Sequence, residues 1–409
     1  MANTFLTPSY FVQSGLDILE NEIVFGNKVA TDLSDQYQQK GDTINIRRQT
    51  QYIGQLNNLD ITSYREDIVE GKVPLKLDQT ATIAVDIGAL DATLSFDRVD
   101  REVIRPVMVK FAEIIDQAIA GTYPQFYHFT GTPGTAISTF ANLADAGAIM
   151  TDYAIPLSDR FAVHSPSAGA KLADGVKTAY VQDIAKTALQ KATIGSYANF
   201  DNYYSALAPT HTVGGLGGTP LINGANQNVT YLASKDTWTQ TLITDGWTAA
   251  AANRLKAGDV FTIAGVFGVN PNTKISTGRL QTFSVQADAA SDASGNLTVT
   301  ISPPMITSGA YQTVTAAPAD NAAITVQTGT ASTAYRQSLL LHPDAIQLVS
   351  RPLFIPQGMG VKTSTKTGNK VSISATEYVD GKTLAHTIRF DMLYKAYAVD
   401  PRLGLRYTN

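Results

Sequence analysis

The pattern of hydrophobic and polar positions is clearest between Asp97 and Gly121, where apolar residues recur at steps of three and four. Proline disfavours helical geometry in the residue before it but is favourable at the first position of a helix. Pro106 therefore predicts a short helix ending near Ile104 and a second helix from Pro106 to Ala120, closed by Gly121. The apolar stripe of the second helix comprises Val107, Met108, Phe111, Ile114, Ile115, Ala118 and Ile119. Its polar face comprises Lys110, Glu113, Asp116 and Gln117.

Alternation with period two predicts a long hairpin in residues 41–88. One expected strand is Thr43–Arg47 and the other is Val73–Ile87, separated by a polar segment from Arg48 to Lys72. A connection of this length is far above the usual range, and a free two-stranded arm is not stable in water. The hairpin is therefore expected to lie against another surface, unless the polar segment is only a solvated loop.

Further helices and strands are predicted in the N-terminal region and after the central helices. Residues 1–40 are predicted to form an irregular arm with one helix inside Gly15–Asp32. Its apolar residues Phe5, Tyr10, Phe11 and Phe25 need a surface to pack on. A compact α/β lobe should follow, with a helix over Ser138–Tyr153, a strand over Arg160–His164 and a short helix capped by Ser167. The residues of its first helix expected to face inward are Phe140, Leu143, Ala144, Ala148 and Ile149.

Composition changes between Val213 and about Thr333, where the chain is rich in Thr, Ala, Gly and Asn and contains no Glu. Short alternating runs separated by turns predict a small β-barrel or sandwich. These runs are Val229–Leu232, Val260–Ile263, Phe283–Val285, Leu297–Ile301 and Ile324–Val326. The α/β pattern resumes at Leu339–Asp344, so the β segment is interpreted as a domain inserted at a surface loop. Later strands are expected at Val371–Thr376, Ala385–Phe390 and Leu393–Val399.

Charge and composition narrow the classes of function. The chain has 409 residues, a net charge of −4, 16% charged residues and no cysteine. The charged fraction is low against the roughly 25% of ordinary soluble domains, which indicates large subunit interfaces or a Thr- and Ala-rich surface. There is no basic excess for tight nucleic-acid binding, and disulfides and thiol chemistry are excluded. The start, MANTFLTPSYFVQ, lacks the charged and apolar regions of a secretory signal, which predicts a cytosolic protein.

Candidate chemistry is sparse. The histidines His128, His164, His211, His342 and His386 are scattered, without metal-ligand spacing. The chain contains neither a nucleophile elbow nor a Walker loop, and Gly214–Gly218 is interpreted as a flexible domain junction. The carboxylate pair Glu66–Asp67 is interpreted as solvated loop charge. No catalytic residue, cofactor or metal is therefore expected.

Several stretches, taken in order, resemble a known family. They are FDRVDREVIRPVMVKFAEIIDQAIAG, SDRFAVHSP, FDNYYSAL, RLKAGDVFTIAGV, LLLHPDAIQLVSRPL and IRFDMLYKAYAVDPRLGLRY. Together with the arm and hairpin, they resemble tailed-bacteriophage major capsid proteins with the Hong Kong 97 fold. The closer resemblance is to the coat proteins of short-tailed phages, which carry a β-barrel insertion domain.

The resemblance implies an α+β fold divided into six parts. They are an N-terminal arm (1–40), an extended loop (41–88), a peripheral domain with a spine helix (89–137), an axial domain (138–212), an inserted barrel (213–334), and the second axial part with a C-terminal return (335–409). The spine helix would pack through Val107, Phe111, Ile114, Ile115 and Ala118. The extended loop would lie over the adjacent subunit, with ion pairs drawn from Arg47, Arg48, Arg65, Glu66, Asp67, Glu70 and Lys72.

The same resemblance implies a shell of hexamers and pentamers. No lysine–asparagine crosslink can be assigned in the sequence, so maturation is expected to be non-covalent. The resemblance also implies scaffolding and portal proteins as partners and assembly in the host cytoplasm. The shell is expected to enclose DNA without sequence-specific binding, and no membrane is expected to take part. Two alternatives stay open: an encapsulin-like compartment shell, and a carbohydrate-binding or adhesin protein that would need Trp238 and Trp247 exposed. A hydrolase is the weakest alternative, because no catalytic constellation is present.

Overall fold

The computed structural model describes residues 8–31, 43–54, 62, 68–87, 104–176, 195–249, 252–353, 362–368, 371–379 and 386–409. The chain divides into two units, each built from separate stretches of sequence. Unit 1 comprises Met1–Asn45, Pro74–Ala120 and Ile346–Tyr397, and unit 2 comprises Ile46–Val73, Gly121–Ala345 and Ala398–Asn409. The domain boundaries expected from the sequence stay predictions.

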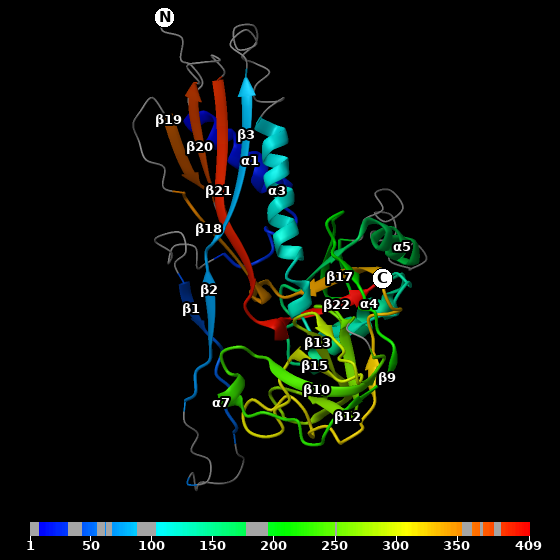
Figure 1. Cartoon of the computed structure of the whole chain (residues 1–409). Coiled ribbons are helices and arrows are strands. Elements are labelled where there is room, and N and C mark those ends of the chain that lie inside the picture. Colours follow the sequence, from blue (N-terminus) through cyan, green and yellow to red (C-terminus); the bar gives the residue numbers. More distant parts are fainter. Residues whose placement is uncertain are drawn as a thin grey trace, which may run out of the picture. The chain divides into compact units, whose positions relative to one another are not determined.

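Unit 1 combines two helices with an antiparallel sheet. The helices are α1 (Pro8–Glu22) and α3 (Arg105–Ala120), which contact one another. The strands of this sheet are β3 (Gln79–Ile87), β18 (Ile346–Arg351), β19 (Lys362–Thr367), β20 (Ser372–Val379) and β21 (His386–Ala398). They follow the order β18-β21-β20-β19, and β3 also pairs with β21. Figure 1 shows the long strands β3, β21 and β20 side by side.

The central helix confirms the prediction made from its periodicity. It spans Arg105–Ala120 and buries five of the seven residues expected on its apolar stripe: Val107, Met108, Phe111, Ile115 and Ile119. The remaining two, Ile114 and Ala118, are half-buried. Asp116, expected on the polar face, is buried, so that expectation is wrong; its carboxylate accepts hydrogen bonds from another segment of unit 1. Most of the short helix expected before Pro106 lies outside the described residues.

Two expectations about the N-terminal half are wrong in detail. The helix in the arm begins at Pro8 and ends at Glu22, earlier at both ends than Gly15–Asp32. The expected strand Val73–Ile87 is two strands, β2 (Lys72–Lys76) and β3, because each has a different partner. The strand β1 (Thr43–Arg47) pairs with β2, whereas β3 pairs with β21 from Gln79 opposite Tyr394 to Ile87 opposite His386.

The α/β part of unit 2 is built on a sheet of seven strands. These are β4 (His128–Thr130), β22 (Gly404–Thr408), β17 (Ala334–Leu341), β5 (Phe161–His164), β7 (Phe200–Tyr204) and β6 (Ser196–Tyr197) in that order, with β8 (Thr210–Thr212) paired to β17. The helices α4 (Phe140–Asp152) and α5 (Pro166–Val176) belong to this part. Its core contains Leu143, Met150, Ala162, Phe200, Leu340 and Leu405.

The first helix of this lobe differs from its expected inward face. Leu143 and Ile149 are buried as expected, but Phe140 is 54% exposed and Ala148 is exposed as well. The reason is the start of α4 at Phe140, where a capping box is formed by Thr139 and Asn142. In the next helix the capping hydroxyl belongs to Ser165 rather than Ser167, since Ser165 Oγ accepts from the Ala168 N–H at 3.3 Å.

The Thr- and Gly-rich region of unit 2 forms a six-stranded antiparallel sheet. Its order is β16 (Ile324–Val326), β12 (Val260–Val269), β13 (Ser276–Val285), β15 (Leu297–Ser302), β10 (Gln240–Trp247) and β9 (Gly218–Ile222). The two ends of this order also meet, because the Ile222 N–H donates to the Ala322 carbonyl at 3.0 Å and Leu221 bridges Ala323. A buried cluster that includes Phe261, Ile263, Phe283, Val299 and Ile301 fills its interior.

Three expectations in this half are corrected. The run Val229–Leu232 is not a strand, because its end enters the short helix α7 (Tyr231–Ser234); β10 was not expected at all. The two strands expected at 385–390 and 393–399 are the single strand β21. Gly214–Gly218, expected to be a flexible junction, is hydrogen-bonded through Gly215 and Leu216 to the carbonyls of Asn253 and Arg254. A β-carbon on Gly214 would lie 2.3 Å from the Arg254 carbonyl oxygen, which explains the glycine.

Candidate assembly surface and buried junction

The charged residues at the base of the hairpin have different surroundings within unit 2. Arg47 Nη1 lies 3.3 Å from Glu70 Oε1 in an exposed ion pair. The Arg48 guanidinium, in contrast, packs on an aromatic ring and lies 5.7 Å from the ring centre of Trp238. The Lys72 N–H donates to Asp236 Oδ1 at 3.0 Å. The role of these residues in ion pairs to a second subunit stays a prediction, and Arg65, Glu66 and Asp67 lie outside the described residues.

Aromatic residues form a platform under the hairpin base. Tyr231 and Tyr311 stack with ring centres 3.5 Å apart and planes inclined by 4°. Tyr231 also meets Trp238 edge to face at 6.4 Å. Arg402 lies 5.6 Å from the Trp238 ring centre, so two guanidinium groups contact this indole. We name Tyr231, Trp238 and Tyr311 the aromatic platform.

A half-buried acid balances the two arginines beside the platform. Asp400 forms an ion pair with Arg402 at 2.7 Å. Burial acts to raise the pKa of Asp400, but the charges of Arg402 and Arg48 hold that pKa below its ordinary value. Burial, conversely, lowers the pKa of Arg48, although Asp400 opposes the effect. The cluster is therefore anionic at Asp400 and cationic at both arginines across the physiological pH range.

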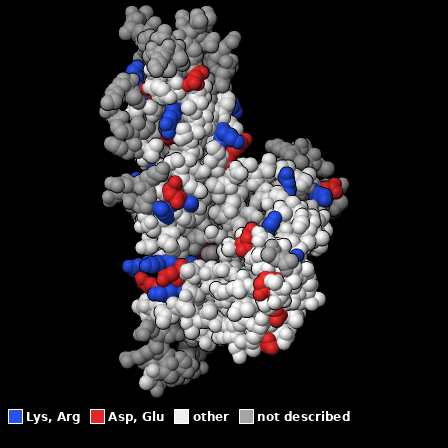
Figure 2. All heavy atoms as spheres, viewed as in Figure 1, with Lys and Arg blue, Asp and Glu red and all other residues white. Residues whose placement is uncertain are grey.

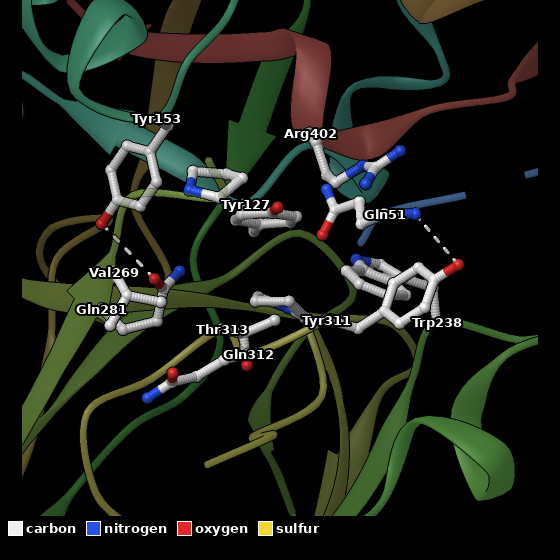
Figure 3. A pocket seen from close by; sticks show the side chains of 12 residues that line it. Gln51, Tyr127, Tyr153, Trp238, Val269, Gln281, Tyr311, Gln312, Thr313 and Arg402 are labelled. Atoms are coloured by element: carbon white, nitrogen blue, oxygen red, sulfur yellow. Dashed lines mark hydrogen bonds between the residues drawn. The ribbon is translucent and has the colours of Figure 1, made fainter. Parts of the chain in front are cut away.

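A small pocket of about 30 Å³ adjoins the platform. Figure 3 shows Tyr127, Tyr153, Trp238, Tyr311 and Arg402 around it. The Gln51 N–H donates to the Tyr311 hydroxyl at 3.2 Å, so the hairpin contributes one wall. A space of this volume holds about one or two water molecules.

The second cluster is a buried junction centred on Asp259. Its Oδ1 accepts from His211 Nε2 at 2.8 Å and from the Thr328 hydroxyl at 2.9 Å. Its Oδ2 accepts the backbone N–H groups of Gly214 at 3.0 Å and Lys256 at 2.8 Å. The junction therefore joins β8 of the α/β sheet to the segments that enter and leave the six-stranded sheet, at Gly214 and Thr328.

Arg406 completes this junction from β22. Its side chain is fully buried, and Nη1 donates to the Gly258 carbonyl at 2.8 Å. The guanidinium also lies 5.6 Å from the ring centre of Tyr123, whose hydroxyl lies 3.1 Å from His211 Nδ1. Burial lowers the pKa of Arg406 to about 10, against the opposing influence of Tyr123 and Asp259. Tyr123, His211 and Asp259 are thus joined in order, with His211 and Asp259 buried and Tyr123 half-buried.

Unit 1 has its own buried carboxylate. Asp116 Oδ1 accepts the N–H groups of Phe25 at 3.1 Å and Gly26 at 3.2 Å, and Oδ2 accepts that of Val24 at 2.9 Å. These donors follow the end of α1, so Asp116 ties the exit of the N-terminal helix to α3. Burial raises the pKa of Asp116, although the three backbone donors act in the opposite direction.

Sequence reasoning missed both clusters of unit 2. Tyr231, Tyr311 and Arg402 carry no motif, and Trp238 was considered only as an exposed glycan platform. Trp238 and Trp247 are each 4% exposed, which removes the basis of that alternative. The sequence pattern did not indicate the partner of His211, because Asp259 lies 48 residues away. The turn at Gly258–Asp259 was the available signal, since it placed an acid at the start of a buried strand.

Uncharged side chains cover most of the described surface on the face that Figure 2 shows. Blue and red groups are sparse on this face apart from one mixed cluster at the lower left, consistent with a chain that is 16% charged. Large apolar side chains in unit 2 are also exposed: Tyr52 by 58%, Ile68 by 69% and Leu157 by 57%. Within the part of the chain that the structure describes, none of the helices is long and apolar enough to span a bilayer.

Comparison with known proteins now identifies the class. The chain matches the family described as P22 coat protein, gene protein 5, over residues 1–408. It is 24% identical over 384 residues to the major capsid protein of Acyrthosiphon pisum secondary endosymbiont phage 1, covering 89% of this chain and 88% of that protein.

Solved structures with similarity to this chain come from phages as well. One, from Mycobacterium phage Che8, is 13% identical, covers 94% of this chain and 90% of that chain, and gives a TM-score of 0.46. Another, the mature capsid of bacteriophage PhiM1, is 12% identical, covers 94% and 86%, and gives a TM-score of 0.44.

The match over nearly the whole chain defines a structural shell protein of a bacteriophage. The chain belongs to the P22 coat protein family. It is a major capsid protein, as the sequence resemblance predicted, and its place is in the virion.

Proposed function

We propose that this protein forms the icosahedral shell of a tailed bacteriophage around double-stranded DNA, using the Hong Kong 97 fold. The observation that carries the proposal is the family match from residue 1 to residue 408. The order of elements supports it: a helix at 8–22, a hairpin, the helix α3 and a sheet that includes the long strand β21. Subunits would assemble as hexamers and pentamers, with scaffolding and portal proteins, in the host cytoplasm.

The six-stranded sheet is proposed to be the β-barrel insertion of this subfamily. Two observations support this proposal. The end strands β9 and β16 hydrogen-bond through neighbouring residues, as closure of a barrel requires. The buried junction at Asp259 gives an inserted domain a defined root, since it connects turns of the sheet to His211 and Arg406 of the host lobe.

The charge-poor surface suits a shell subunit. Specific interfaces bury about 1,600 Å² each, and a shell subunit has several neighbours. A net charge of −4 also suits a container whose DNA must be packed and released, because tight phosphate binding would oppose release. The hairpin is proposed to lie over an adjacent subunit, with the exposed Arg47 and Glu70 near that contact.

Electron microscopy of the purified protein, alone and with its scaffolding protein, tests the proposal. Closed polyhedral shells, tubes or partial shells are the expected result. A monodisperse monomer of 43.7 kDa under both conditions would contradict it. Shells that package a protein cargo instead of DNA would favour the encapsulin-like alternative.

A further inference from the structure

The hairpin base is held against its own chain at a point where only glycine fits. A β-carbon on Gly71 would lie 2.3 Å from the Lys235 carbonyl oxygen, 3.0 Å from the Tyr231 hydroxyl and 3.1 Å from Arg48 Cδ. The first contact is with backbone, which cannot rotate away as a side chain can. Gly71 therefore permits an approach of hairpin and platform that any larger residue would prevent.

Contacts on both sides of Gly71 hold the two legs of the hairpin. The Arg48 N–H donates to the Gly71 carbonyl at 2.8 Å, which joins the legs at this level. From there the Arg48 guanidinium reaches Trp238, and the Lys72 N–H reaches Asp236. A cation on an indole face contributes about 0.5–2 kcal/mol, depending on its exposure to water.

Tyr311 also contacts both legs of the hairpin, at residues nearer its tip than Arg48 and Gly71. Its hydroxyl accepts the Gln51 N–H at 3.2 Å and donates to the Val69 carbonyl at 3.4 Å. One phenol therefore bridges both legs, next to the backbone hydrogen bond that joins them between Arg48 and Gly71. Because Tyr311 is itself stacked on Tyr231, the spacing of the legs is set by the aromatic platform.

We propose that Gly71 and Arg48 are positioning residues for capsid assembly. Their docking on the aromatic platform orders the root of the hairpin before a neighbouring subunit receives it. An arm that is already ordered at its root loses less conformational entropy on capture, so association is faster and tighter. This inference rests on the proposed function of the hairpin as an inter-subunit arm.

The substitution Gly71→Ala tests the inference, with Gly54→Ala as its matched control. No heavy atom lies within 4 Å of a β-carbon on Gly54, which belongs to the same hairpin. Each chain is co-expressed with the scaffolding protein, and shells are separated from free subunits on a gradient. Docking is followed in the free subunit by tryptic cleavage of the Arg48–Gln49 bond, identified by mass spectrometry.

Gly71→Ala is expected to raise cleavage after Arg48 at least tenfold and to lower the rate of shell formation by a similar factor. The thermal unfolding midpoint of the free subunit should stay close to that of wild type. Gly54→Ala should match wild type in all three measurements. If cleavage rises while shells form at the wild-type rate, docking does not position the hairpin. If neither measurement changes, the docking itself is refuted.

A second variant covers the case in which Gly71→Ala does not fold. Arg48→Gln keeps the backbone bond to Gly71 but removes the cation from Trp238, and it should lower the rate of shell formation by a smaller factor. Trypsin does not cleave after glutamine, so shell formation alone is measured for this variant. An Arg48→Gln subunit that assembles like wild type would then overturn the inference. Failure of the wild-type chain to form shells under any condition would instead overturn the proposed function.

Discussion

Two buried aspartates, one in each unit, are compensated for the loss of water in different ways. Asp116 in unit 1 relies on three consecutive backbone N–H groups, of Val24, Phe25 and Gly26. Asp259 in unit 2 accepts from two side chains, His211 and Thr328, and from two backbone groups. A buried carboxylate needs compensation in either case, because an isolated charge is costly away from water.

The different sets of hydrogen-bond donors show which segments each carboxylate connects. The donors to Asp116 belong to one short segment, so it determines how one loop packs on one helix. The donors to Asp259 come from three separate segments, 211–214, 256 and 328. Asp259 therefore joins two sheets, and Arg406 of β22 lies beside it. Backbone donors are available at any sequence, whereas His211 and Thr328 must both be present. The junction at Asp259 should therefore tolerate substitution less well.

The largest expected effect is at the junction. Asp259→Ala should lower the free energy of unfolding by about 3–5 kcal/mol, since it leaves buried donors without an acceptor. Asp259→Asn keeps one oxygen and should cost less, because two of the four donors retain an acceptor. Urea unfolding of the free subunit measures both. A cost below 1 kcal/mol for the alanine variant would mean that the junction does not stabilise unit 2.

A smaller loss is expected in unit 1. Asp116→Ala should cost about 2–3 kcal/mol, because three backbone donors lose their acceptor. Burial raises the pKa of Asp116, so the folded carboxyl binds a proton more readily than the unfolded one. Wild type should therefore gain stability relative to Asp116→Asn as the pH falls from the folded towards the unfolded pKa. Parallel pH profiles for the two proteins would contradict this.

His128 is a buried group of another kind, because among the described residues no carboxylate forms a hydrogen bond or ion pair with it. His128 lies between Tyr127 and Tyr153, with ring centres at 4.4 and 4.2 Å. Burial lowers its pKa to about 3, so it stays neutral in the folded chain while the unfolded histidine takes up a proton below about pH 6.5.

Stability should consequently fall as the pH drops from 6.5 towards 3, by up to about 1.4 kcal/mol per pH unit from this residue. His128→Phe keeps the ring and removes the proton. Relative to wild type, the variant should gain about 2 kcal/mol between pH 6.5 and pH 5. Melting curves at the two pH values measure the gap, and a constant gap would show that His128 is accessible to protons in the folded chain.

The smallest effect is expected at the exposed ion pair. Glu70→Ala removes the partner of Arg47, whose side chain is 79% exposed, and should change the stability of the free subunit by about 0–1 kcal/mol. If the pair lies near a neighbouring subunit, the same variant should reduce shell stability in low salt more than it affects the monomer, because high salt screens exposed ion pairs. Equal and negligible effects in both assays would remove Arg47 and Glu70 from the proposed contact.

Local pattern predicted the elements well where one physical signal dominated. Helix α3 follows from a proline at its start, a glycine after its end and apolar steps of three and four. Strands β12, β13, β15 and β16 follow from alternation between turn residues. The family resemblance predicted a shell protein, and the family match confirms that class.

Pattern failed where a partner distant in sequence decides the outcome. The split between β2 and β3 depends on β1 and β21, which pair with different strands. Strand β10 contains Asp245 and Gly246, which weaken its propensity, but pairing with β15 and β9 compensates. The periodicity of α3 places Asp116 among polar residues, yet the segment after α1 covers it.

The sequence by itself determined the helix α3, most strands of the Thr-rich region, a charge-poor surface and membership of a capsid class. These properties depend on neighbours within a few residues or on composition. Only the tertiary structure decided that Arg48 lies on Trp238, that His211 meets Asp259 and that Gly71 has no room for a side chain. Each of those contacts joins residues separated by more than forty positions, and hydrophobic periodicity carries no information about which distant segments will meet.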